Sequence, residues 1–217
     1  NLIKNELNNL INLGIDSLTL DDDYFTNASI ADCFGNLINV LPSSMSYYLD
    51  QIVPPLIVIL QEDFYDLLDF QKEQLIISKS SSMVSLSKFI GCLPNEMEDY
   101  ACSPILDYII EEGIDLFCVK ACEGIGFSCE GYFRLKVPFD EVLIILFDNI
   151  LDIDDKNSIS AILMTSGEIF SIYNTNFQAE TINRIIYIIV QIFKDPPDSF
   201  LKNSHNKTID DTILPSL

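Results

Sequence analysis

Between Lys4 and Lys72 lie 67 residues that contain eleven carboxylates and neither Lys nor Arg. The whole chain carries 33 Asp and Glu against 12 Lys and Arg, a formal net charge of −21. A net charge this far from zero weakens the compact state by self-repulsion. However, 48% of the residues are hydrophobic, with 14 Phe and 9 Tyr, which is enough to bury a core. We therefore expect a folded protein with a strongly negative surface.

This charge restricts the partners that the surface attracts. Nucleic-acid binding depends on neutralising phosphates with Lys and Arg, so we expect no nucleic-acid partner. Anionic membrane surfaces are disfavoured for the same reason. The longest apolar runs, 52–60 and 185–193, are also much shorter than the roughly 20 residues that span a bilayer. We predict no membrane partner.

The six cysteines leave two interpretations of the compartment open. Free, partly buried thiols in a cytoplasmic protein are favoured, because a chain of this size needs no disulfides for stability. The alternative is a secreted domain with three disulfides and glycans at Asn27 and Asn206, each of which begins an Asn-X-Ser/Thr triplet. Cys118 and Cys122 share one face of a predicted strand, which favours burial as small hydrophobic side chains.

Helical patterns dominate the first half, about residues 1–113. Phe64, Leu67, Leu68 and Leu75 form the apolar stripe of one predicted helix, whose outer face is acidic. Residues 80–82, three serines, indicate a loop, and the Pro54-Pro55 pair predicts a break or kink. The segment 103–113 has Ser at the N-cap position, Pro at the first helical position and Gly at its end.

The second half has strand-like patterns. Residues 115–122 and 127–137 flank Gly124-Ile125-Gly126 and predict a β-hairpin, and residues 159–165 and 168–173 flank Ser166-Gly167 and predict a second. The apolar run 142–147 is consistent with a buried strand or a helix. Residues 180–193 predict a closing helix. The predicted fold is a single α+β domain over 1–197, helical in 1–113 with an antiparallel sheet plus helix in 114–197, followed by a polar tail over 198–217.

The residue inventory argues against catalysis. His205 is the single histidine and lies in the predicted tail, which leaves no imidazole for a nucleophilic triad or a His-ligated zinc site. The Gly124 and Gly126 region fails the dinucleotide-loop and nucleophile-elbow patterns. The segment from Asp152 fails as a calcium loop, because Asn157 stands at the Gly position and Leu163 at the bidentate Glu position. We predict no enzyme activity, no cofactor and no metal.

Charge is then the best guide to function. An acidic surface speeds association with a basic partner and can imitate the phosphates that a nuclease recognises. The leading hypothesis is a protein-binding protein, such as an immunity protein that neutralises a basic toxin or nuclease. The alternatives are an acidic chaperone or assembly subunit that binds a partner segment on its sheet or hydrophobic helices, and the secreted domain; a homo-oligomer stays open. For the Ile-rich run 182–192, burial in the chain's own core is favoured over a client or dimer groove. The candidate partner-binding residues are Asp21, Asp22, Asp23, Glu62, Asp63, Asp66, Asp69, Glu73, Glu96, Glu98, Asp99, Asp107, Glu111 and Glu112.

Overall fold

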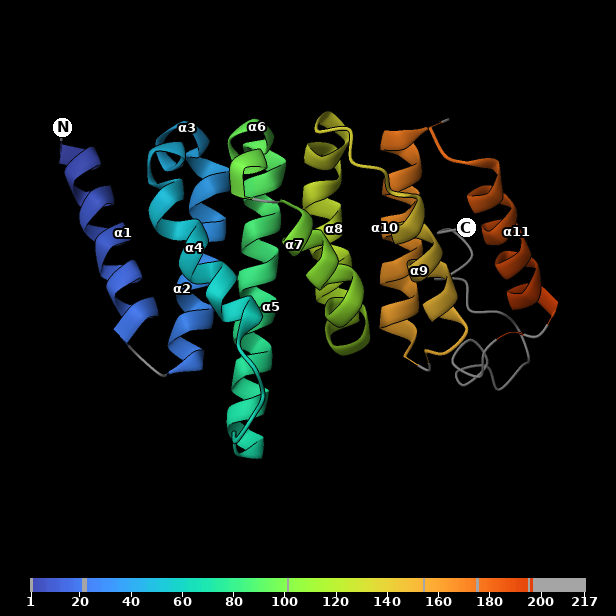
Figure 1. The fold of residues 1–217 in the computed structure, drawn as a ribbon, viewed down its shortest axis with the longest axis horizontal. Helices are drawn as coiled ribbons and strands as arrows, with labels where there is room; N and C mark the ends of the chain where they lie inside the picture. Colours follow the sequence, from blue (N-terminus) through green and yellow to red (C-terminus); the bar gives the residue numbers. More distant parts are fainter. Residues whose placement is uncertain are drawn as a thin grey trace. The chain divides into compact units, whose positions relative to one another are not determined.

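The structure is a computed structural model that describes residues 2–20, 23–100, 102–153, 155–174, 176–194 and 196. Every regular element in this part of the chain is a helix, and none is a strand (Figure 1). The predicted α+β class is therefore wrong. The chain divides into two compact units, residues 1–109 and 110–217, which are described separately. The single-domain organisation stays a prediction.

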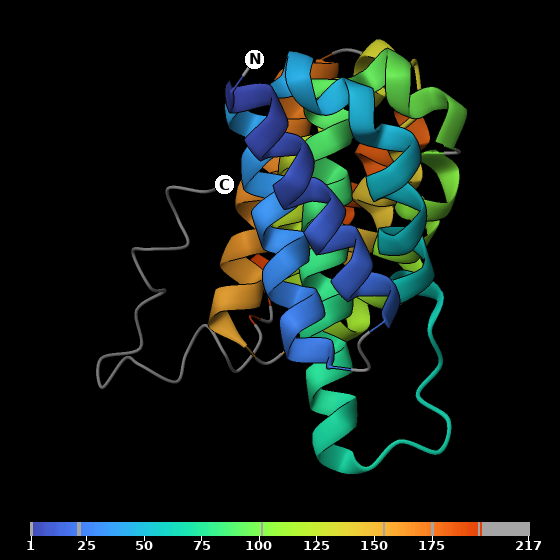
Figure 2. The same cartoon turned by 90° about the vertical axis from the view of Figure 1, so that its left-hand side faces the viewer.

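Unit 1 is built around one long helix, α5 (Asp69–Cys92). It packs against α2 (Tyr24–Val40), α4 (Leu49–Gln61), α6 (Pro94–Met97) and α7 (Cys102–Tyr108). The remaining elements are α1 (Leu2–Leu20), α3 (Pro42–Met45) and the 3-10 turns η1 (Ser46–Tyr48) and η2 (Glu98–Tyr100). Figure 2 shows α1 and α2 in front of α5, with residues 62–68 forming a loop beside the first turns of α5.

The serine-rich middle of α5 is a packing surface and not the predicted loop. Ser82 and Ser85 are buried, and the Ser85 hydroxyl donates a hydrogen bond to the Ala31 carbonyl of α2. Gly35 of α2 lies opposite, and a Cβ atom added to it would come within 2.5 Å of Ser85 Oγ. Small residues on both helices thus allow a close crossing. Tertiary packing overrides the turn preference of serine.

Two further local predictions for unit 1 concern Pro54-Pro55 and Phe64. Of the break or kink predicted at the proline pair, the break is wrong and the kink stays a prediction, whereas the helix predicted to include Phe64 is wrong. Helix α4 continues through Pro54 and Pro55 without a break, and six of its aliphatic residues are buried: Leu49, Ile52, Val53, Leu56, Ile59 and Leu60. Burial of these side chains outweighs the roughly 3 kcal/mol that proline costs in a helix interior. The helix predicted to include Phe64 begins only at Asp69, where the Gln71 side chain accepts a hydrogen bond from the Leu68 backbone N–H.

Unit 2 consists of α8 (Ile114–Arg134), α9 (Asp140–Ile150), α10 (Lys156–Tyr173) and α11 (Ala179–Lys194). Helix α10 packs against α8 and α9, and α9 packs against α11. A π-helical turn, Ile109–Gly113, precedes α8 in the chain. The sequence predicted that Gly113 ends a helix in the left-handed conformation. This prediction is wrong, because Gly113 has a φ of −68°.

Both predicted hairpins, apart from residues 135–137, and the alternative strand at 142–147 are helical. Helix α8 is kinked at Phe117, whose φ of −136° and ψ of 39° are not helical. The buried residues of α8 include Ala121, Ile125, Cys129 and Tyr132, which recur every three or four residues. No described glycine has a positive φ, so Gly124 and Gly126 make no turn. A Cβ atom at Gly126 would lie 2.9 Å from a Glu168 carboxylate oxygen of α10, which indicates close helix packing there. The β-branched composition misled the prediction, and the helical spacing of the buried residues decides the structure.

Helix α11, the predicted closing helix, is present and has apolar residues on two sides. Ile185, Ile188 and Ile192 are buried. Its opposite side leaves large apolar side chains exposed: Ile186, Tyr187, Val190 and Phe193. The predicted tail, residues 198–217 with His205, lies outside the described residues.

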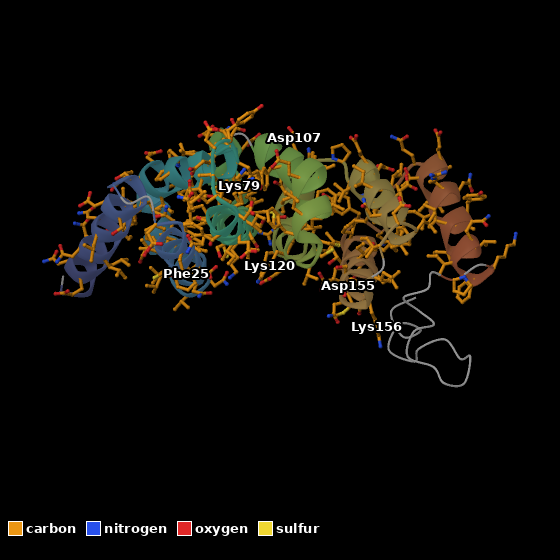
Figure 3. All side chains as sticks on the ribbon, turned by 90° about the horizontal axis from the view of Figure 1, so that it is seen from below. Phe25, Lys79, Asp107, Lys120, Asp155 and Lys156 are labelled. Atoms are coloured by element: carbon orange, nitrogen blue, oxygen red, sulfur yellow. The ribbon has the colours of Figure 1, made fainter. Side chains whose placement is uncertain are left out.

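Asp155 caps the beginning of α10 (Figure 3). Its carboxylate accepts hydrogen bonds from the Ser158 backbone N–H at 2.8 Å and from the Ser158 hydroxyl at 2.7 Å. These hydrogen bonds lower the pKa of Asp155, because they stabilise its charged form.

Asp155→Ala is expected to reduce the free energy of unfolding by about 1 kcal/mol at neutral pH. Because the pKa of Asp155 is lower in the folded state, the ionised carboxylate stabilises the fold at pH values above the ordinary carboxyl pKa of about 4. This stabilisation is lost as the pH falls and the carboxylate becomes protonated. The difference between wild type and Asp155→Ala should therefore shrink below pH of about 4. Urea unfolding across this range measures it, with Asp152→Ala, an exposed carboxylate near the same turn, as the control. Equal losses in both variants would contradict the capping role.

Candidate acidic docking surface

The structure does not bring all the predicted carboxylates together. Asp23 and the acidic residues of 62–73 belong to the beginning of α5 and its surroundings, whereas Glu96, Glu98 and Asp99 follow its end. At 24 residues, α5 is about 36 Å long, so the groups lie far apart in unit 1. Asp21 and Asp22 lie outside the described residues, and the Glu111 side chain is not described.

The first group is assembled from two distant parts of the sequence. The hydroxyl of Tyr24, at the beginning of α2, donates a hydrogen bond to the Glu62 carboxylate. This contact places Asp23 beside the segment that follows α4. Asp23 itself caps α2, accepting hydrogen bonds from the Thr26 hydroxyl and the Phe25 backbone N–H. The Thr26 hydrogen bond is the main reason that the pKa of Asp23 is lowered, so its charge is retained.

A buried lysine holds the loop of residues 62–68 from beneath. Lys79 of α5 is only 3% exposed, and its ammonium lies 4.7 Å from the centre of the Phe64 ring. The same ammonium lies 5.6 Å from the Tyr108 ring of α7, which makes a second cation–π contact (Figure 3 labels Lys79). The Phe64 and Tyr108 rings thus share one buried cation of α5. Asp66 turns the loop with a φ of 59°, a conformation that Asp tolerates better than most residues.

The carboxylates of this loop and of the first turns of α5 point to solvent. Asp63, Asp66, Asp69 and Glu73 are exposed, and Glu62 is half-buried. Lys72 lies 3.8 Å from the Asp69 carboxylate, and both side chains are well exposed. Within the described residues, Asp63, Asp66 and Glu73 have no ion-pair partner. We call this set the acidic edge; it consists of Asp23, Glu62, Asp63, Asp66, Asp69 and Glu73.

The remaining predicted carboxylates form no single group, and Glu112 belongs to unit 2. Glu96, Glu98 and Asp99 are exposed on α6 and η2, Asp107 is exposed on α7, and Glu112 is exposed in the π-helical turn. Asp50 of α4 accepts a hydrogen bond from the Tyr100 hydroxyl, which attaches η2 to α4. Burial, followed by this carboxylate, raises the pKa of Tyr100 to about 12, so the hydroxyl stays a donor at neutral pH.

Sequence reasoning missed the residues that organise the acidic edge, namely Tyr24, Phe64 as an anchor, Lys79 and Tyr108. Lys79 stands between serines and carries no pattern that separates a buried lysine from an exposed one. Its role depends on rings that are 15 residues before it and 29 residues after it in the chain. The base-free run ends at Lys72, and its ion pair with Asp69 has the i, i+3 spacing that a helix predicts.

The described residues show no arrangement for metal chemistry, because no three His, Cys, Asp or Glu side chains converge there. The described thiols are free at Cys33, Cys92, Cys118, Cys122 and Cys129. A hydrogen bond from Cys122 lowers the pKa of Cys118, and both lie on one face of α8 at a spacing of four. In the same part of the chain, no helix is long and apolar enough to cross a membrane.

Compared with known proteins, the chain matches no family model, no curated protein and no solved structure. The function is therefore argued from the geometry of its own residues.

Proposed function

We propose that this protein is a non-enzymatic binding protein that docks a basic partner protein on the acidic edge of unit 1. The observation that supports the proposal best is the pre-arranged loop of residues 62–68. Its carboxylates are exposed, while Phe64 and Glu62 are held by Lys79 and Tyr24. The partner class is a cationic protein, such as a nuclease or toxin with a basic cleft.

Two physical effects favour docking at this surface. Uncompensated carboxylates attract a cationic surface at long range and raise the association rate. The contacts of Phe64 and Glu62 restrict the loop before binding, so less conformational entropy is lost when the partner arrives. A flexible acidic segment of equal charge would give the first effect without the second.

Neutralising four carboxylates of the acidic edge tests the proposal. The variant removes four charges through the substitutions Asp63→Asn, Asp66→Asn, Asp69→Asn and Glu73→Gln. Asn is suitable at position 66, because it tolerates the left-handed backbone found there. We expect the affinity for the basic partner to fall about tenfold or more at low salt, since each exposed charge pair contributes modestly. Wild-type affinity should also fall steeply between about 0.05 and 0.5 M salt, and that salt dependence should be weaker in the variant.

A matched control separates this surface from overall charge. The control variant neutralises four other exposed carboxylates, so both variants have the same net charge. Its substitutions are Glu6→Gln, Asp16→Asn, Asp32→Asn and Asp152→Asn. The partner is cross-linked in cells that produce the protein, identified by mass spectrometry, and titrated in purified form by calorimetry. A neutral or acidic partner would contradict the proposal, as would equal losses of affinity in the two variants.

A further inference from the structure

Unit 2 contains a groove between α9 and α11 with a volume of about 770 Å³. Two polar contacts join the helices on either side of it. Near the beginning of both helices, the Asp140 carboxylate accepts hydrogen bonds from the Thr181 hydroxyl at 2.7 Å and from the Gln178 backbone N–H at 2.9 Å. Further along, Arg184 donates to Asp148 at 2.8 Å. The two helices therefore run side by side in the same direction.

Most residues that line the groove are polar, Asn183 among them, but its lining also includes two isoleucines of α9 that lie between these two contacts in the chain. Ile144 and Ile145 of α9 line it, and both are only partly buried by the protein itself. The polar contacts hold the walls in place, so the apolar surface is available without rearrangement. A preformed groove between parallel helices that exposes two isoleucines among polar side chains is a suitable site for an amphipathic helix, whose apolar face can cover the isoleucines.

The rim of the groove is acidic. Glu141 and Glu180 also line it, are exposed, and have no ion-pair or hydrogen-bond partner among the described residues. Arg184, the cationic residue that lines the groove, already forms an ion pair with Asp148. Lys or Arg side chains on the polar face of a bound helix would complement the two unpaired carboxylates, whereas acidic side chains would be repelled.

We propose that this groove binds a basic amphipathic helix of a partner protein, with its apolar side chains on Ile144 and Ile145 and its cations at Glu141 and Glu180. The α9 wall, Asp140–Ile150, has 11 residues and is about 16 Å long, which matches three turns of a bound helix. This site is separate from the acidic edge, and the inference does not rest on the proposed function.

The probe is an 18-residue peptide of Leu and Lys in which Leu recurs at helical spacing. It is titrated into the full chain by fluorescence anisotropy, beside a peptide of the same composition in scrambled order and a Leu–Glu peptide with the same helical pattern. We expect the amphipathic basic peptide to bind at least ten times more tightly than either comparison peptide. A photoreactive group on its apolar face should cross-link to residues 140–148 or 178–184.

Three variants locate the binding. Glu141→Gln with Glu180→Gln should weaken the basic peptide about fivefold, as expected for two exposed charge pairs. Ile144→Gln should weaken it more than tenfold, because the apolar contact is lost. Asp152→Asn with Glu168→Gln removes two other exposed carboxylates of unit 2 and should change affinity by less than about twofold. Unchanged helical circular dichroism confirms that each variant is folded, and the variant of the acidic edge should keep its affinity for the peptide.

Several outcomes would overturn the proposal. If the scrambled peptide bound as tightly as the amphipathic one, binding would reflect general charge attraction. The same conclusion would follow if Glu141→Gln with Glu180→Gln and Asp152→Asn with Glu168→Gln lost equal affinity. An unaffected Ile144→Gln variant would exclude the groove. The wild-type chain could also self-associate in sedimentation experiments. If Ile144→Gln abolished that self-association, a second copy of the chain would occupy the groove instead.

Discussion

Replacing Phe139 with alanine is expected to reduce the free energy of unfolding of unit 2 by about 3 to 5 kcal/mol. Phe139 precedes α9 and is fully buried. Its ring centre lies 4.9 Å from that of Tyr173 in α10 and 5.6 Å from that of Tyr132 in α8. The Tyr173 hydroxyl also donates to the Val137 carbonyl at 2.9 Å, so one aromatic cluster joins α8, α10 and the connection that leads to α9. Removing the ring leaves a cavity in the middle of this cluster.

Urea unfolding measures this effect, with two controls. Phe139→Leu keeps most of the volume and should cost about 1 kcal/mol. Phe193→Ala makes the same chemical change at a residue of α11 that is 51% exposed, and it should cost less than about 0.5 kcal/mol. A loss in Phe139→Ala no larger than that in Phe193→Ala would contradict the aromatic cluster as the core of unit 2.

Gly35→Val is expected to destabilise unit 1 by about 3 kcal/mol, because the crossing of α2 and α5 has no room for a side chain. An added Cβ atom would lie 2.5 Å from Ser85 Oγ and 3.1 Å from the backbone of the same residue. The hydroxyl can rotate away only by giving up its hydrogen bond to the Ala31 carbonyl. The close approach to the Ser85 backbone persists after that rotation, so the helices themselves must move apart.

The second variant in this series removes the obstacle on the other helix. Gly35→Val combined with Ser85→Gly should recover part of the lost stability, measured as a coupling energy in a double-mutant cycle. Gly167→Val is the control, since a Cβ atom at Gly167 meets nothing within 4 Å, and it should be close to neutral. Additive effects of Gly35→Val and Ser85→Gly would contradict a direct contact.

Together the two substitutions also test the single-domain prediction. Gly35 belongs to unit 1 and Phe139 to unit 2. If residues 1–197 form one cooperative domain, both substitutions lower the temperature of a single unfolding transition. Two transitions, each lowered by one substitution alone, would contradict that organisation.

The acidic edge was partly predictable from the sequence. Exposed carboxylates on the outer side of an apolar stripe identified Asp63, Asp66, Asp69 and Glu73, because ionised groups stay in water unless they are paired. Their grouping with Asp23 was not predictable, since it depends on the Tyr24–Glu62 hydrogen bond across 38 residues. The groove between α9 and α11 was likewise missed, because residues 142–147 suggested a buried strand as readily as a helix.

The amino-acid sequence by itself determined the strong negative charge, the helical nature of the first half and the apolar side of α11, since these depend on composition and local periodicity. Tertiary structure alone decided that α8 and α10 are helices and not hairpins, that the serines of α5 pack inside a helix, and that Lys79 anchors Phe64. The role of Lys79 depends on rings that are distant in the chain. The first two points share a physical reason. Glycine, serine and β-branched residues have weak local preferences, and the free energy of close helix–helix packing exceeds those preferences.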